Sequence, residues 1–290
     1  MKSTAGTGTA VAIEVGPDDA RWEFIGLRVQ RIHAGGFVNY SSGPDEVCLV
    51  PLEGTADVES DGQTWTISRP GSIFDGKPTA LYLPTGSTMT ITAGDGDAQV
   101  AIASSRASER FPARLITQDE IEVEIRGAGN AARQINHIIP PEFPAHRLLV
   151  VEVFTPSGNW SSFPPHKHDV SNLPDEADLE EIYYYRIDPS EGFGFQRLYT
   201  ADGSIDHAWV IRDGDLVLVP EGYHAFAVAH GYTAYYLNVL AGDEAIRTMQ
   251  PSDDPAFAWI RETWSDSSKE GLASYRDIDA RVNAGAGRRS

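Results

Sequence analysis

The sequence predicts an all-β protein in which a β-sandwich, or jelly-roll barrel, is duplicated and accompanied by few short helices. The apolar runs are strand-sized and rich in Val, Ile, Tyr and Thr, and dipeptides typical of turns separate them. The two halves of the chain also repeat one spacing of strand and turn residues. A long, clean 3.6-residue periodicity, which would indicate amphipathic helices, does not occur before residue 240.

Nine segments have the length and composition of β-strands. Turn signals between them include Asp61-Gly62, Asp202-Gly203 and Asp213-Gly214. Many short strands separated in this way favour a sandwich or barrel over alternating strands and helices. The expected strands are Val47–Leu52, Thr64–Ser68, Thr88–Thr92, Val100–Ser104, Leu148–Phe154, Ile182–Ile187, Phe195–Thr200, Leu216–Val219 and Ala234–Leu240.

The internal repeat pairs the strings EVCLV and PTGST, 38 positions apart, with EIYYY and PEGYH, 39 positions apart. In this register Glu46 matches Glu181, and Thr88 matches His224. The first copy has no paired histidines, so we expect the chemistry in the second copy and a structural role for the first.

Four segments are expected along the chain: an N-terminal arm over 1–20, an N-terminal repeat without metal ligands over 21–130, a C-terminal metal-binding repeat over 131–264 and a polar tail over 265–290. Residues 105–147 connect the two repeats in this interpretation. Pro140, Pro141 and Pro144 lie there, and proline disfavours both a helix interior and a central strand.

The formal net charge is −19, because 42 Asp and Glu residues outnumber 23 Lys and Arg residues. Nucleic acid and anionic membranes bind clustered cations, so neither is expected as a partner. A single cysteine, Cys48, excludes an internal disulfide and fits a reducing compartment. The chain shows no signal-peptide pattern and no apolar stretch of membrane-spanning length, so a cytoplasmic protein is expected.

Three histidines form the most informative pattern. His166 and His168 point to the same face if their segment is a strand, because strand side chains alternate. His224 follows a turn in the same repeat, and Glu180 or Glu181 could add a carboxylate. Three nitrogens and one oxygen suit Zn, Mn, Fe or Ni and leave a position open for substrate. The remaining histidines are expected to be solvated or hydrogen-bonded: His33, His137, His146, His207 and His230.

These motifs resemble the paired metal-binding motifs of the cupin superfamily. Gly214, Pro220, Gly222 and His224 match the second motif, except that one residue rather than two separates Gly222 from His224. The first motif departs more, because twelve residues follow His168 before the glutamate at position 181, where many cupins have three or four.

The long insertion and its surroundings resemble one cupin family, the 5-deoxy-glucuronate isomerases of myo-inositol catabolism. The resemblance covers most of residues 145–260 and is looser around 46–54 and 71–86. Ala225 and His230 stand where prolines are expected in this family, which affects a loop and no ligand. The matching strings are WSSFPPHKHD, LEEIYYYR, GFGFQRLYT, DLVLVPEGYH, YYLNVLAG and DDPAFAW.

The resemblance implies a bicupin whose C-terminal repeat binds a divalent metal ion, Zn or Mn. The implied reaction is the isomerisation of 5-deoxy-D-glucuronate to 5-dehydro-2-deoxy-D-gluconate, and a homo-oligomer is expected. Glu181 is preferred to Glu180 because it begins its strand in register with Glu46 of the other repeat. The implied ligands are His166, His168, Glu181 and His224.

Such an isomerase must move hydrogen between neighbouring carbons, and the candidates for a base near the motif are Lys167, Glu180, Tyr183 and Tyr185. A metal-assisted hydride shift, which exchanges no hydrogen with solvent, is the competing route. Arg186 or Arg197 would hold the substrate carboxylate. Gln196 is the alternative to Arg197, because two strand neighbours cannot both face the interior.

Two other functions remain open from the sequence. Nearly the same ligand set serves Fe(II)-dependent cupin dioxygenases, so chemistry with molecular oxygen is the first. A non-catalytic cupin that binds a sugar acid is the second. The expected partner is a small anionic sugar acid in the isomerase and in the non-catalytic interpretation.

Overall fold

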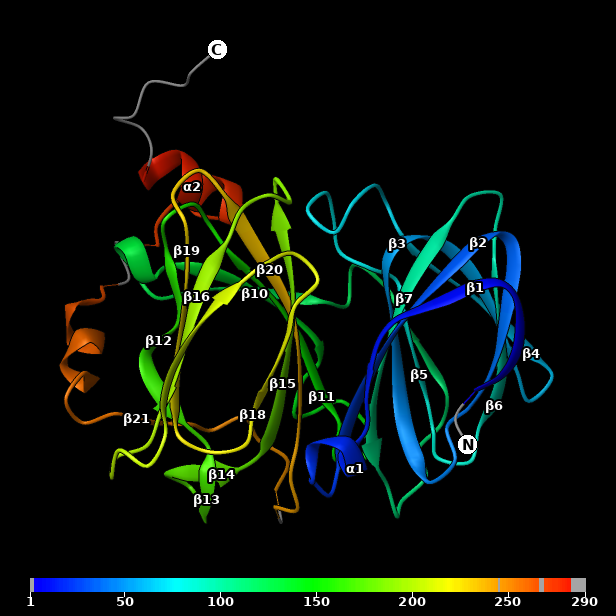
Figure 1. Cartoon of the computed structure of the whole chain (residues 1–290), viewed down its shortest axis with the longest axis horizontal. Coiled ribbons are helices and arrows are strands. Elements are labelled where there is room, and N and C mark those ends of the chain that lie inside the picture. Colours follow the sequence, from blue (N-terminus) through cyan, green and yellow to red (C-terminus); the bar gives the residue numbers. More distant parts are fainter. Residues whose placement is uncertain (1–2, 245, 266–268, 283–290) are drawn as a thin grey trace. The chain divides into compact units, whose positions relative to one another are not determined.

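The structure, a computed structural model, describes residues 3–244, 246–265 and 269–282 and divides into two compact units. The N-terminal unit comprises residues 1–122, 138–150 and 239–247. The C-terminal unit comprises residues 123–137, 151–238 and 248–290. Each unit is therefore built from three separate stretches of chain, which can be followed by colour in Figure 1.

Antiparallel strands make up the N-terminal unit. They are β1 (Ser3–Val15), β2 (Ile25–Ser41), β3 (Asp45–Ser60), β4 (Gln63–Arg69), β5 (Ala80–Leu83), β6 (Thr88–Ala93), β7 (Ala98–Arg106) and β8 (Arg114–Ile116). The long strands β2 and β3 each pair with both β6 and β7, so these four strands close a ring. Closing a sheet on itself removes unpaired edges, which is the property of a barrel.

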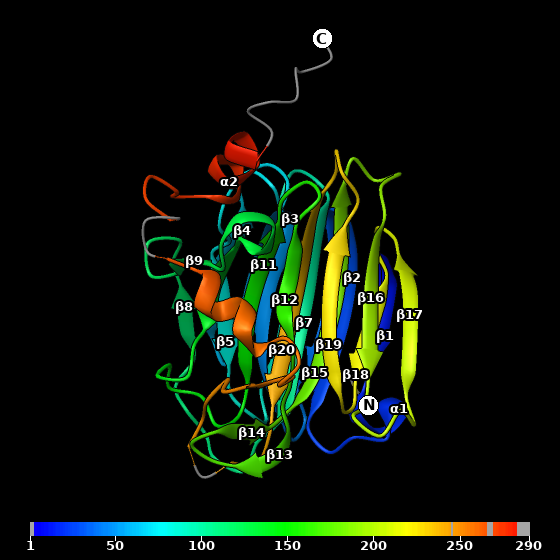
Figure 2. The same cartoon turned by 90° about the vertical axis from the view of Figure 1, so that its left-hand side faces the viewer.

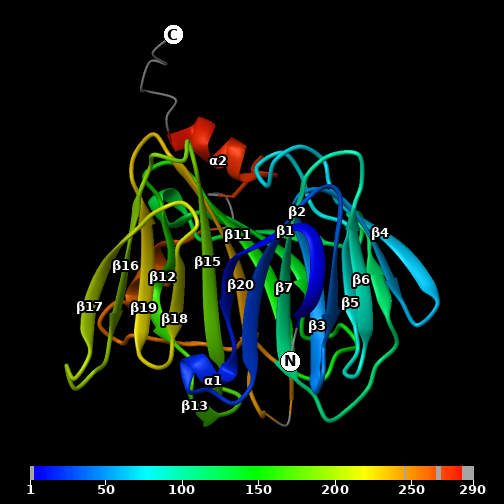
Figure 3. The ribbon, with the colours of Figure 1, turned by 45° about the vertical axis from the view of Figure 1, so that its right-hand side comes forward.

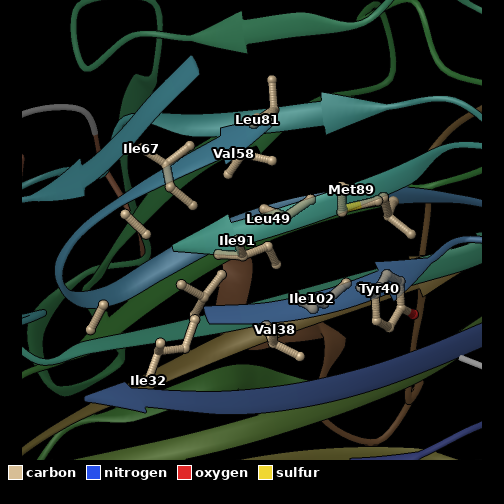
Figure 4. Close-up of a cluster of buried hydrophobic side chains, with 14 of the residues drawn as sticks. Ile32, Val38, Tyr40, Leu49, Val58, Ile67, Leu81, Met89, Ile91 and Ile102 are labelled. Atoms are coloured by element: carbon tan, nitrogen blue, oxygen red, sulfur yellow. The ribbon is translucent and has the colours of Figure 1, made fainter. Parts of the chain in front are cut away.

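The interior of this ring is filled with aliphatic side chains. Leu49, Ile91 and Ile102 come from three different strands and are buried in one cluster (Figure 4). Along β6, buried side chains alternate with more exposed ones, as expected for a strand with one face toward a core. Burial of this apolar surface is the main favourable term in the folding of the unit.

Two sheets lie mostly within the C-terminal unit, and residues 138–139, 149–150 and 239–241 of the first sheet are counted with the N-terminal unit. The first contains β18 (Leu216–Val219), β15 (Glu180–Asp188), β20 (Thr233–Ala241), β11 (Leu149–Thr155), β10 (Arg133–Ile139) and β9 (Glu122–Arg126), in that order. The second contains β17 (Asp206–Ile211), β16 (Gly194–Tyr199), β19 (Tyr223–Val228), β12 (Trp160–Lys167) and β21 (Ser252–Asp253). Figure 2 shows β17, β16, β19 and β12 in this sequence, and Figure 3 shows β15 beside β20.

A single cluster of buried side chains joins these two sheets. Val153, Tyr185 and Tyr236 come from the first sheet, and Leu198 and Phe226 come from the second. Two sheets that share one core form a sandwich, with inward and outward residues alternating along each strand. A separate hairpin, β13 (Asp169–Asn172) and β14 (Glu176–Asp178), occupies the insertion between the histidine pair and β15.

The helical segments are short: α1 (Pro17–Ala20), η1 (Gly129–Ala131), η2 (Ala258–Thr263) and α2 (Tyr275–Val282). The predicted fold class, an all-β duplicated sandwich or barrel with few short helices, is confirmed. None of the helices in the described part of the chain has the length and apolar character needed to cross a bilayer.

All nine expected strand segments lie within strands, to within one residue at each end. The segment expected to be an N-terminal arm forms β1 and pairs along β2. The stretch expected to be a connection contains β8, β9 and β10, so the inference from its prolines was too broad: Pro140 follows β10 directly and interrupts no strand. In the expected polar tail, 275–282 is helical, while 266–268 and 283–290 lie outside the described residues.

Strand pairing corrects the register of the internal repeat by one residue. Val47 pairs with Leu83, directly before Pro84, and Glu181 pairs with Val219, directly before Pro220. Position 181 therefore corresponds to Val47 and not to Glu46. The equivalent position of the N-terminal unit holds an apolar residue inside its core. Because valine stands at this position, the N-terminal unit has no carboxylate equivalent to that of Glu181.

Glu46 faces the other side of its strand and has a structural role. Its buried carboxylate accepts hydrogen bonds from the backbone amides of His146, Arg147 and Leu148, with N···O distances of 2.8, 2.7 and 2.7 Å. The phenol of Tyr82 donates a fourth bond, at 2.7 Å. One side chain thus satisfies three consecutive backbone donors that are 100 or more residues away in sequence.

Replacement of Glu46 by Ala is expected to lower the free energy of unfolding by about 3 kcal/mol, because buried amides lose their acceptor. Glu46→Gln retains an acceptor oxygen without the charge, so we expect a smaller loss of about 1–2 kcal/mol. Urea unfolding of both variants measures the difference. The amount of metal bound per chain should be unchanged in both variants. The structural role would be contradicted if the free energy of unfolding of Glu46→Ala lay within about 0.5 kcal/mol of that of the unsubstituted protein, which is the scale of a neutral surface substitution.

Candidate metal centre

The histidine pair lies at the end of β12, in the second sheet of the C-terminal unit. His166 is directly opposite His224 of β19 in the antiparallel pairing. Directly opposed residues share one face of a sheet, so both rings point the same way. Glu181 lies near the start of β15 in the other sheet, and its side chain points inward and is buried. The two sheets of the sandwich therefore supply different members of one group.

A bulge in β12 sets the direction of the histidines. The pairing of β12 with β19 jumps from Ser161 opposite Phe226 to His166 opposite His224. Five steps along β12 thus face two along β19, and the extra residues include Ser162 with a φ of +49°. Ser161 lies opposite Phe226, which faces the core, so five regular steps from Ser161 would turn His166 outward. The bulge absorbs the odd step and brings His166 onto the same inward face as His224.

Three side chains meet at one point inside the unit. Nε2 of His168 lies 2.6 Å from Oε2 of Glu181, and Nε2 of His224 lies 3.1 Å from the same oxygen. The three residues are at most 5% exposed, and one ligand atom from each lies within 4.8 Å of the others. His166 adjoins them, with its ring centroid 4.7 Å from that of His224, and retains some accessible surface.

The backbone orients all three imidazoles. Nδ1 of His168 donates to the carbonyl of Leu179 at 3.0 Å, and Nδ1 of His166 and of His224 face the carbonyls of Pro164 and Gly222 at 3.3 and 3.4 Å. Carbonyl oxygens only accept, so the proton is assigned to Nδ1 and the lone pair to Nε2. This is the second-shell arrangement typical of metal-binding histidines.

The burial of these groups acts on their ionisation. Burial opposes the charge of Glu181, but the charges and hydrogen bonds of His168 and His224 outweigh it and hold the pKa of Glu181 well below its ordinary value. Burial and the neighbouring imidazoles lower the pKa of His166 well below its ordinary value. Burial also opposes the charge of His168, but the charge and hydrogen bond of Glu181 outweigh it and raise the pKa of His168. A divalent cation that binds here would therefore take the place of the proton that His168 and Glu181 share.

The donor set fits a metal ion. Nε2 of His224 is buried and, within the part of the chain that the structure describes, has no hydrogen bond of good geometry, although the Glu181 carboxylate is 3.1 Å away. Buried nitrogen atoms are rarely left in this way unless a ligand completes them. Two imidazoles and a carboxylate, with a third imidazole adjacent, are the ligands of Zn and of the neighbouring divalent transition metals.

An aromatic wall adjoins the cluster. Tyr183 and Tyr185 are stacked on the inward face of β15, and the Tyr183 ring centroid lies 5.8 Å from that of His224. The Tyr183 hydroxyl is 3.0 Å from Oγ of Ser162, which is also 3.5 Å from the hydroxyl of Tyr236. Burial, and then the Glu181 charge, raises the pKa of Tyr183 well above its ordinary value. These phenols are neutral at physiological pH.

Gln196 faces inward and Arg197 faces outward, which resolves the choice between these two neighbours. Gln196 is fully buried, and its carbonyl accepts a hydrogen bond from the Tyr185 hydroxyl. Its amide nitrogen has no hydrogen-bond partner among the described residues. Arg197 lies on the exposed face of β16 and forms two 2.9 Å hydrogen bonds with Asp206.

Two other predicted residues also point away from the cluster. Lys167 lies between the two histidines on the opposite face, and its ammonium is 2.7 Å from Glu176. Arg186 follows Tyr185 on β15 and pairs with Asp213 at 2.8 Å. Sequence reasoning did not select Ser162 and Tyr236. Tyr235 and Tyr236 are neighbours in a strand, so the sequence indicates that one of their side chains faces inward. The inward direction of the Ser162 side chain depends on the bulge, which the sequence does not signal.

An open pocket of about 290 Å³ lies on the outer side of the second sheet. Lys167, Asp169 and Tyr223 line it together with the loop at 200–204, and no member of the cluster does. Asp169 also accepts a 2.7 Å hydrogen bond from the amide of Gly222, which ties the hairpin to the turn before His224. The hydrogen bond braces the hairpin against this turn, while the histidine and glutamate side chains of the cluster lie on the inward face.

Comparison with known proteins gives concordant matches. Residues 1–260 match the KduI/IolB family. A 5-deoxy-glucuronate isomerase of Geobacillus kaustophilus is 43% identical over 253 residues, which are 87% of this chain and 91% of that protein. One of Bacillus subtilis strain 168 is 40% identical over 258 residues, or 88% and 94%. The crystal structure of an IolB-like protein from Salmonella typhimurium is 37% identical, with a TM-score of 0.82 over 90% of this chain and 98% of that one.

Replacement of His168 or His224 by Ala, or of Glu181 by Gln, is expected to remove bound divalent metal. Each change deletes a buried donor, so the affinity for Zn²⁺ should fall by more than the roughly 10- to 100-fold typical of second-shell substitutions. Metal content after dialysis, measured by mass spectrometry, tests this. Glu180→Gln is the matched control, since Glu180 lies on the other face of β15, and loss of metal from this variant alone would contradict the assignment.

Proposed function

The chain belongs to the KduI/IolB family, and from this premise we propose that it is an aldose–ketose isomerase acting on 5-deoxy-D-glucuronate. The product is 5-dehydro-2-deoxy-D-gluconate, which places the protein in inositol catabolism. The observation that carries the proposal is the buried group of His168, Glu181 and His224. It occurs in a chain that is 40–43% identical to proteins named 5-deoxy-glucuronate isomerase.

The proposed metal ligands are His166, His168, Glu181 and His224, with Zn or Mn as the ion. His166 is included because its Nδ1 faces a carbonyl like those of the other two, which leaves its Nε2 as a donor. It also keeps some accessible surface, which agrees with a position beside entering substrate. When bound, the ion would supply Lewis acidity to the oxygens on C1 and C2 of the sugar.

Isomerisation moves one hydrogen from C2 to C1 and one proton from the C2 hydroxyl to the C1 oxygen. We assign the second transfer to the hydroxyls of Tyr183, Ser162 and Tyr236, which form a continuous set at 3.0 and 3.5 Å. A hydroxyl both donates and accepts, so such a set can carry a proton between two oxygens without ionising.

Gln196 and Tyr185 are proposed to position the sugar hydroxyls. The Tyr185 phenol bonds one end of the Gln196 amide, so the other end remains available inside a water-poor interior. An unsatisfied amide donor is costly unless a ligand completes it, and a polyhydroxylated substrate offers acceptors.

The setting of the enzyme is proposed to be the cytoplasm, consistent with its single buried thiol, Cys48. Self-association is also proposed. Strand β17 is the edge of the second sheet, and Trp209 and Val210 on it are 38% and 42% exposed. Exposed apolar edge strands are sites at which a second chain commonly pairs.

Turnover by the metal-loaded protein is the direct test. Zn²⁺- or Mn²⁺-loaded protein is expected to convert 5-deoxy-D-glucuronate to the ketose, observed by NMR, and chelated protein is expected to be inactive. Oxygen uptake that depends on Fe(II), without ketose, would instead identify a dioxygenase. Binding of the sugar acid without turnover under any metal would identify a non-catalytic cupin.

Reaction in D2O separates the two routes for carbon-bound hydrogen. Among the described residues, the hydroxyl and amide groups that adjoin the cluster are neutral phenols, a serine and a glutamine, and none of these is a base at neutral pH. We therefore predict direct transfer, so that the former aldehyde carbon carries no deuterium in the product NMR spectrum. Extensive deuterium there would contradict direct transfer and require a base.

A further inference from the structure

Arg133 is a buried arginine that sequence reasoning did not select. It is 3% exposed and begins β10, in the first sheet of the C-terminal unit. Ile135, two residues further on, belongs to the core cluster of the sandwich. Side chains two residues apart in a strand lie on the same face, so the Arg133 side chain also leaves β10 on the face that points to the core.

Its hydrogen bonds leave most of its donors unused. Nη1 donates to the carbonyls of Ala131 and Phe163 at 3.1 and 3.2 Å, and the guanidinium lies 5.9 Å from the ring centroid of Trp264. Within the described part of the chain, no carboxylate is within ion-pair distance of Arg133. Other arginines of this unit do have acidic partners: Arg126 with Glu124, Arg186 with Asp213, Arg197 with Asp206 and Arg261 with Asp253.

The Arg133 guanidinium binds the backbone next to the serine of the proposed proton-carrying hydroxyls. Its acceptor, Phe163, directly follows Ser162, whose hydroxyl contacts Tyr183 and Tyr236. The electrostatic effect of Arg133 also reaches His166 and Tyr236, contributing to the lowered pKa of His166. Gly127 packs so closely that a Cβ there would lie 2.9 Å from Nη1, which restricts where the head group can go.

A buried, unpaired cation is energetically costly. Burial lowers the pKa of Arg133 to about 10, so the group is still protonated at neutral pH. A charge held in a low-dielectric interior normally has a partner of opposite sign. The Arg133 guanidinium keeps unused donors that suit bidentate binding of a carboxylate.

We propose that Arg133 is the carboxylate-binding residue of the site, pairing with the acid group at the end of the substrate opposite to the reacting carbons. This inference rests on the proposed function, in which the substrate is a sugar acid that reacts at C1 and C2 and carries its carboxylate at C6. It replaces the outward-facing Arg186 and Arg197 in that role. It also makes Arg133 the residue that distinguishes a uronate from a neutral aldose.

The test compares Arg133→Met and Arg133→Lys with the unsubstituted metal-loaded protein. Calorimetry measures the binding of D-glucuronate and of D-glucose, its neutral counterpart, and NMR measures KM and kcat for 5-deoxy-D-glucuronate. Arg31→Met is the matched control, because it makes the same charge change at an exposed position on β2. Thermal unfolding of each variant verifies the fold.

Arg133→Met is expected to weaken D-glucuronate binding and to raise KM by about 30-fold, within the range for a lost charge-assisted pair, while D-glucose binding is unchanged. Arg133→Lys should recover part of the loss. Thermal stability of Arg133→Met should be equal or higher, since an unpaired buried charge is removed. Control values should match those of the unsubstituted protein.

Two results would overturn the inference: unchanged glucuronate affinity and KM in Arg133→Met, or an equal loss for both sugars together with lower stability, which would indicate a structural role. The proposed function fails separately. If the unsubstituted protein binds D-glucuronate through Arg133 but does not convert 5-deoxy-D-glucuronate, the carboxylate site stands and the isomerase assignment does not.

Discussion

The candidate centre depends on one constraint: imidazole nitrogens and a carboxylate oxygen must share a small volume from which water is excluded. The two sheets of the C-terminal unit meet this constraint from opposite sides, with His224 on β19 and Glu181 on β15. Neighbouring features follow from it. The bulge at Ser162 returns the histidines to the interior, and backbone carbonyls fix their Nδ1 protons. A rigid framework of this kind holds donor atoms in place before any ion arrives.

The sequence could predict the sandwich because strand length and turn chemistry are local properties. It also pointed to the cluster, since an alternating histidine pair needs only the strand period. The repeat register that favours Glu181 over Glu180 is one residue out, as strand pairing shows. Glu181 is nevertheless the glutamate whose carboxylate contacts His168. Arg133 could not have been found this way. The proposal for Arg133 depends on its burial and on the lack of an acid partner among the described residues, and both are properties of the folded chain.

The two repeats show how one framework separates chemistry from stability. Val47 stands where Glu181 stands in the other repeat, and it packs in the N-terminal core instead of holding a ligand. The nearby carboxylate of Glu46 faces outward from that core and binds three backbone amides. Both glutamates are buried, but their partners differ: N–H and O–H donors of the fold satisfy Glu46, whereas Glu181 faces the imidazole nitrogens of His168 and His224. The strand face on which the residue sits decides whether the carboxylate serves the fold or the site.

The strong negative charge of the chain bears on how it would select an anionic substrate. Acids on the outer faces neutralise the exposed cations, as Asp206 does for Arg197 and Asp213 does for Arg186. Those arginines already have partners, and in water such pairs contribute little free energy. Arg133 differs because it is buried and, among the described residues, no carboxylate lies within ion-pair distance, although the charge of Glu124 still acts on it from further away. An incoming carboxylate then gains an interaction that solvent does not weaken, and a neutral sugar gains nothing from the same group. In the proposal for Arg133, selectivity for a sugar acid follows from an interior cation that has no carboxylate partner among the described residues of an otherwise acidic protein.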